Sequence, residues 1–88
     1  MTRYGYANGM FKDQALVQYD VLKASGMDFD GGIVVNQPWE DFLMLLESGD
    51  EVVVVAKSRL SMDPDECKGR QEILQLLDVN LVALAQGL

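Results

Sequence analysis

The segment Glu51-Val52-Val53-Val54-Val55-Ala56-Lys57 contains four consecutive valines and decides the fold of this chain. β-Branched residues favour strands, and an apolar run without polar alternation is typical of a strand buried on both faces. Such strands belong to parallel sheets whose two faces are covered by helices. The segment therefore predicts the centre of an α/β domain.

Strand and helix patterns alternate on both sides of this strand. The remaining expected elements, in chain order, are a strand at Thr2–Ala7, a helix at Lys12–Ser25, a strand at Ile33–Val35, a helix with Pro38 as its first residue, a helix that Asp63 caps and Pro64 begins, and a strand at Val79–Ala85. Four strands joined by three helices predict a three-layer, doubly wound, four-stranded parallel sheet. We expect one domain over residues 1–88.

Apolar residues recur at helical spacing in each expected helix, which indicates the faces that pack on the sheet. These faces are Leu16, Tyr19 and Leu22 in the first helix, Trp39, Phe42, Leu43 and Leu46 in the second, and Ile73, Leu74 and Leu77 in the third. Gly26 is expected to end the first helix.

Composition excludes several classes of protein. The chain has 88 residues, a formal net charge of -7, no histidine and the single cysteine Cys67. An intrachain disulfide and a Cys/His zinc site are therefore excluded. The first residues lack the apolar stretch of a signal peptide and no apolar run could span a membrane, so we expect a cytoplasmic protein. The acidic charge opposes binding to DNA or an anionic membrane, and it suits either a basic protein partner or solubility alone.

The segment Tyr6-Ala7-Asn8-Gly9-Met10, followed by Gln14 in the first helix, resembles the start of the serine recombinase (resolvase/invertase) catalytic domain. In that family a Tyr-Ala-Arg-Val-Ser-Thr segment follows the first strand, and its serine attacks a DNA phosphodiester. By this resemblance, Met10 stands at the serine and Asn8 at an arginine. A thioether has no proton to lose and cannot be such a nucleophile, which implies a member without catalysis.

The segment Lys57-Ser58-Arg59-Leu60-Ser61-Met62 resembles the family's Lys-Leu-Asp-Arg-Leu-Gly-Arg hallmark. Arg59 and Leu60 match, Ser58 replaces a catalytic aspartate and Met62 replaces a second arginine. The resemblance covers nearly the whole chain and implies these degenerate active-site positions: Tyr6, Asn8, Met10, Gln14, Ser58, Arg59 and Met62. Gln37 stands near another family arginine, and Gln18 matches a family glutamine if one residue is deleted before it.

The family's long dimerisation helix and helix-turn-helix domain have no counterpart here. The resemblance therefore implies a monomer or weak dimer that does not bind nucleic acid directly. In the family's strand order the first and third strands are neighbours, so their following loops should lie side by side. We expect them to expose Met10, Phe11, Leu60 and Met62 as a protein-binding surface. In the alternative interpretation, Met10 and Phe11 pack on the first helix and Met62 fills a gap.

Other chemistries have weaker support. The spacing Gly5-Tyr6-Ala7-Asn8-Gly9 lacks a phosphate-loop lysine. The carboxylates Asp28, Asp30, Asp50 and Glu51 do not form an EF-hand pattern and are expected to be separate and solvated. Ser58 and Ser61 have no histidine to serve as base. Arg59 could bind a phosphate, but we expect it to pair with Asp13 or to be solvated. No catalytic residue, metal or cofactor is expected.

The leading hypothesis is a non-catalytic regulator that binds a DNA-binding repressor or recombinase, like an antirepressor or inhibitor of a phage or mobile element. The alternatives are an acidic DNA mimic, a small ligand-binding or enzymatic domain, and a fragment of a longer regulator.

Overall fold

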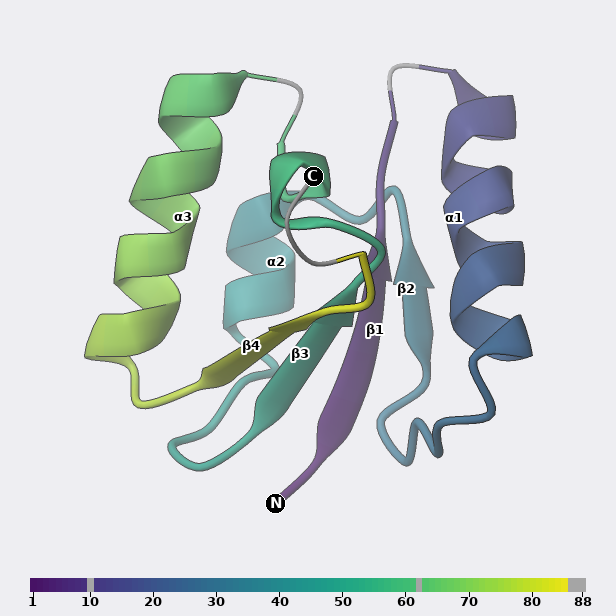
Figure 1. Ribbon diagram of the computed structural model, residues 1–88. Coiled ribbons are helices and arrows are strands. Elements are labelled where there is room, and N and C mark those ends of the chain that lie inside the picture. Colours follow the sequence, from purple (N-terminus) through teal and green to yellow (C-terminus); the bar gives the residue numbers. More distant parts are fainter. Residues whose placement is uncertain (10, 62, 86–88) are drawn as a thin grey trace.

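Four parallel strands lie at the centre of the computed structural model, which describes residues 1–9, 11–61 and 63–85 (Figure 1). The elements in chain order are β1 (Arg3–Ala7), α1 (Lys12–Ala24), β2 (Ile33–Val35), α2 (Trp39–Leu43), β3 (Glu51–Val54), a 3-10 turn η1 (Lys57–Arg59), α3 (Pro64–Leu76) and β4 (Asn80–Ala83). The strand order is β2-β1-β3-β4 and every pair is parallel. The predicted α/β class, with a four-stranded parallel sheet and three helices, is confirmed, as is the pairing of the first and third strands.

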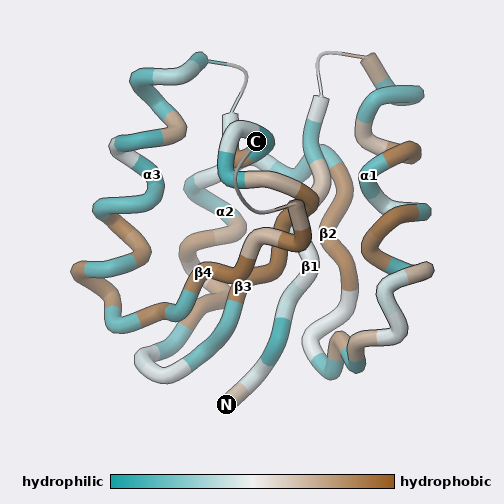
Figure 2. The backbone as a smooth tube through the Cα atoms, in the orientation of Figure 1, coloured by the Kyte–Doolittle hydropathy of each residue, from teal (hydrophilic) through white to brown (hydrophobic). Residues whose placement is uncertain are grey.

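Helices cover both faces of this sheet, with α1 on one face and α2 and α3 on the other (Figure 1). The valines of β3 alternate between the two layers. Val52 and Val54 pack with α2 and α3, whereas Val53 packs with α1, and all three are 0% exposed. Figure 2 shows strongly hydrophobic stretches along the strands, while hydrophilic and hydrophobic residues alternate along α1 and α3. The expectation of a central strand buried on both faces is therefore correct.

An aromatic cluster anchors α2 to β1. The Tyr6 ring stacks on Phe42 with 4.6 Å between centroids, and it meets Trp39 edge-on at 5.8 Å. Stacked and edge-to-face arrangements are the favourable geometries for aromatic pairs. Pro38 has an extended backbone (ψ 138°) and precedes the helix, so the helix begins at Trp39 rather than at the proline.

The buried face of α1 differs from the predicted one. Ala15, Gln18 and Leu22 are buried, whereas Leu16 is 40% exposed. The helix is rotated because the Gln18 amide hydrogen-bonds both the backbone N–H and the carbonyl of Asn8. The periodicity of apolar residues does not predict that a glutamine is buried. The predicted end of the helix is correct, since Gly26 has a left-handed φ of 77°.

The third helix begins as predicted, but its buried stripe is narrower. The Asp63 carboxylate accepts a hydrogen bond from the Asp65 N–H at 2.9 Å, and Pro64 is the first helical residue. Cys67 and Leu74 are buried, while Ile73 and Leu77 are 38% and 42% exposed. The reason is that α3 packs over the sheet edge, against β4 and η1, so only one narrow stripe meets the sheet.

Within the described residues, no helix is long and apolar enough to cross a membrane.

Candidate functional site

The loops after β1 and β3 meet at the carboxyl edge of the sheet, as the strand order predicts. They are joined by the main-chain carbonyl of Leu60, which accepts hydrogen bonds from Asn8 Nδ2 at 3.0 Å and from Arg70 Nη1 at 2.6 Å. Leu60 is 0% exposed, so this carbonyl needs internal donors. Asn8 therefore holds the two loops together.

Further hydrogen bonds fix the loop after β1. The Gln18 side chain accepts from the Asn8 N–H at 3.2 Å and donates to the Asn8 carbonyl. The Gly9 N–H donates to Asn36 Oδ1 at 3.0 Å, and Asn36 itself has a left-handed φ of 53°. These hydrogen bonds tie the loop after β1 to α1 and to the residue that follows β2.

The predicted apolar surface requires a correction. Leu60 is fully buried in the core beneath α2 and α3, because the η1 turn directs its side chain inward, and it cannot contact a partner. Phe11 is 65% exposed at the start of α1, as predicted for a surface residue and contrary to packing on the helix. Met10 and Met62, the other two members, lie outside the described residues.

The other residues that the sequence analysis expected at this edge separate into two groups. Tyr6 lies in the aromatic core and is 1% exposed. Ser58 and Arg59 are exposed. Within the described residues no carboxylate pairs with Arg59, so of the two expected alternatives the structure agrees with a solvated Arg59 and not with a pair to Asp13. Gln14 and Arg59 line the same groove.

This groove, which we call the α1–β3 groove, has a volume of about 280 Å³ and is lined by Gln14, Val17, Gln18, Val21, Val55 and Arg59. Val17 and Val21 are 63% and 41% exposed. Val55, Val82 and Leu84 on the same face of the sheet are only partly buried. Among the described residues α1 is the sole helix on this face, and it packs against β1, β2 and β3. The groove therefore lies on the open side of α1 and combines three valines with two glutamines and Arg59.

Carboxylates gather at the opposite, amino end of the sheet, where they hold loops in place. Asp50 is 5% exposed and accepts hydrogen bonds from the Thr2 and Glu47 N–H groups, each at 2.9 Å. Glu51 pairs with Arg3 Nε at 2.6 Å. The expectation that Asp50 and Glu51 are solvated is wrong, because both have structural partners.

Two groups at this end have shifted pKa values. The hydrogen bond from the Arg3 N–H to Asp30, 2.7 Å long, lowers the pKa of the Asp30 carboxyl. Burial, followed by the negative charges of Asp50 and Glu47, raises the pKa of the Tyr4 hydroxyl. The described residues include no group of three acidic or cysteine side chains placed to hold a metal ion.

Arg70 was missed by the sequence interpretation. Besides its bond to Leu60, its guanidinium lies 4.8 Å from the centre of the Trp39 ring and 3.3 Å from a Glu66 carboxylate oxygen. The spacing of Glu66 and Arg70 indicates a helical ion pair, but nothing in the sequence connects Arg70 to the Leu60 carbonyl. Cys67 is buried beside Ser61, which fits a packing role.

No protein-family model matches this chain, and no curated protein matches it.

Proposed function

We propose that this chain is a resolvase-like domain without catalysis that regulates a DNA-binding repressor or recombinase by binding it. The proposal starts from the chemistry of the resemblance. A methionine stands at the nucleophile, and a cluster of arginines, which in the family stabilises charge on the phosphate, is reduced to Arg59. Asn8, at one lost arginine position, is used to join two loops.

The observation that carries the proposal is the α1–β3 groove. Parallel sheets are generally covered by helices on both faces. Here Val17 and Val21 of α1 and Val55 beyond β3 remain accessible beside it. An amphipathic helix of a partner fits such a surface, because its apolar face would cover these valines much as another helix of an α/β domain would. The proposed occupant is therefore a partner helix.

Charge specifies the kind of partner. The chain carries a net charge of -7, so it attracts a basic protein at long range and repels nucleic acid. Repressors and recombinases present basic surfaces to DNA. The DNA-mimic alternative gains less support, because Asp50 and Glu51 are engaged by the protein's own backbone and by Arg3.

The test has two steps. Tagged protein captures partners from the native cells, and each enriched DNA-binding protein is purified and titrated with the domain at low and at high salt. We expect direct binding that weakens moderately with salt, because an apolar contact persists when charges are screened. Binding that is abolished by salt and by competing DNA would instead identify a DNA mimic. No direct binding by any purified candidate would overturn the proposal.

A further inference from the structure

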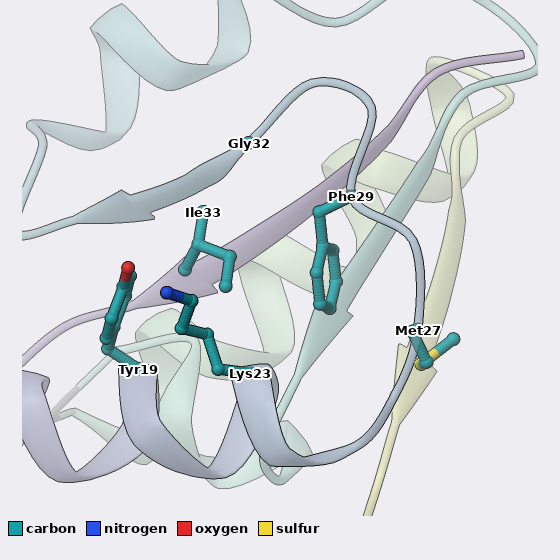
Figure 3. A pocket seen from close by; sticks show the side chains of 6 residues that line it. All are labelled: Tyr19, Lys23, Met27, Phe29, Gly32 and Ile33. Atoms are coloured by element: carbon teal, nitrogen blue, oxygen red, sulfur yellow. The ribbon is translucent and has the colours of Figure 1, made fainter.

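A second hollow lies under the carboxyl end of α1, away from the α1–β3 groove. It has a volume of about 330 Å³ and is lined by Tyr19, Lys23, Met27, Phe29, Gly32 and Ile33. Figure 3 shows Tyr19 and Lys23 rising from α1 while Ile33 and Phe29 come from β2 and the loop before it. This size lies at the lower end of the range of small-molecule sites in proteins.

The lining combines apolar walls with one cation. Met27, Phe29 and Ile33 are half-buried and form the apolar part. Lys23 Nζ lies 5.5 Å from the centre of the Tyr19 ring, and in the described part of the chain no carboxylate is within salt-bridge distance of it. This ammonium can pair with an anion while the apolar walls accommodate the anion's apolar body.

The walls of this hollow are fixed before any ligand arrives. The Gly32 N–H donates to the Phe29 carbonyl at 2.9 Å, which closes a turn, and the Gly32 carbonyl accepts from the Gly5 N–H at 3.0 Å. The Gly31 N–H donates to the Arg3 carbonyl at 3.0 Å, so the loop is tied to β1. A ligand therefore does not have to order this loop, which reduces the free energy lost on binding.

The neighbouring carboxylates limit the charge of the ligand. Asp28 and Asp30 line an adjacent hollow together with Arg3 and Phe29, and Asp30 accepts a hydrogen bond from the Arg3 N–H. Asp20 follows Tyr19 on α1 and is exposed. With Lys23 as the single cation in the lining, these groups disfavour a dianion. We infer that the hollow binds a small monoanion with an aromatic or aliphatic body, such as an aryl carboxylate, whose carboxylate pairs with Lys23.

The experiment is a titration of the full chain, labelled with ¹⁵N, with phenylacetate and with its neutral amide, phenylacetamide, followed by amide chemical shifts. We expect saturable shifts confined to the end of α1, the following loop and β2, with a dissociation constant of about 1 mM. The amide should bind about fivefold more weakly, a difference in affinity that matches the contribution of a partly exposed ion pair.

Variants assign this difference to Lys23, which is exposed. Lys23→Gln should weaken phenylacetate binding about fivefold and make the acid and the amide equal, while Lys23→Arg should retain the preference. Lys68→Gln, an exposed lysine of α3 on the other face of the sheet, is the matched control and should change nothing. The inference is overturned by no saturable shift up to about 10 mM ligand, by shifts elsewhere in the chain, or by an acid preference that survives in Lys23→Gln.

Discussion

The shared carbonyl of Leu60 predicts that two substitutions will be more damaging together than the sum of their separate effects. Asn8→Ala removes a neutral hydrogen bond of 3.0 Å, and Arg70→Met removes a charged donor at 2.6 Å while keeping an apolar stem against Trp39. Typical net contributions are about 1 kcal/mol for the first bond and about 2 kcal/mol for the second. Each single variant leaves the carbonyl one donor.

In the double variant the Leu60 carbonyl has neither side-chain donor, although Leu60 is 0% exposed. An unsatisfied buried acceptor costs about 1–3 kcal/mol beyond the lost bonds, so the double variant should lose about 4–6 kcal/mol rather than about 3 kcal/mol. The assay is urea unfolding of the four proteins by circular dichroism, with Trp39 fluorescence in parallel. Lys68→Ala, at an exposed position of α3, the helix that contains Arg70, is the control. Additivity within about 0.5 kcal/mol would refute the reasoning, because it would mean that the carbonyl does not depend on this pair of donors.

Three further predictions concern stability and reactivity. Gly26→Ala should destabilise the protein by about 1 kcal/mol because the φ of this residue is 77°, in the left-handed region. Gly69→Ala should stabilise it by up to about 1 kcal/mol, because Gly69 lies inside α3 and nothing outside its own helix backbone and chain neighbours lies within 4 Å of the added carbon. Thermal unfolding measures both changes in stability. The pKa of Asp30 is lowered in the folded state by the Arg3 N–H, so its contribution is present above the unfolded pKa and is lost as pH falls through the folded pKa. Asp30→Asn should therefore reduce the loss of stability between about pH 4 and pH 2, and an unchanged acid limb in urea unfolding would contradict this. Cys67 is 6% exposed, so Ellman's reagent should label its thiol at the rate of unfolding. Immediate labelling in native buffer would contradict the burial of this side chain.

The sheet could be predicted from the sequence because its signals are local. The valines of β3 and the Asp63-Pro64 start of α3 each specify their own element through backbone and burial preferences that neighbours do not override. Strand order followed only from the resemblance, since nothing in the strand patterns themselves determines which strands pair.

The faces of the helices were harder to predict, because tertiary hydrogen bonds decided them. Gln18 is buried since it hydrogen-bonds the Asn8 backbone. This orientation of α1 places Ala15 on the buried face of the helix and leaves Leu16 and Val17 accessible. Leu60, an apolar residue in a loop, was expected at the surface, but the η1 turn directs its side chain inward. Its side chain joins the core while its carbonyl joins two loops.

The two hollows beside α1 could not be predicted from periodicity. Lys23 has the pattern of an ordinary surface residue of a helix and Tyr19 was expected to pack on the sheet, whereas the hollow forms because the loop before β2 folds back against both. Likewise, the α1–β3 groove exists because a single described helix covers this face of the sheet, which is a property of packing rather than of any one segment.

The most direct test of the proposed partner-binding function is the affinity of the purified partner for variants of the α1–β3 groove. Val17→Asn/Val21→Asn changes two groove residues at nearly constant helix propensity. Met44→Asn/Leu76→Asn, two apolar residues that are each 85% exposed and are absent from the groove lining, is the matched control. We predict that the groove variant binds at least about tenfold more weakly, equivalent to about 1.4 kcal/mol, while the control stays within about twofold of wild type. Equal affinities for the groove variant and wild type, with both proteins folded, would contradict the account.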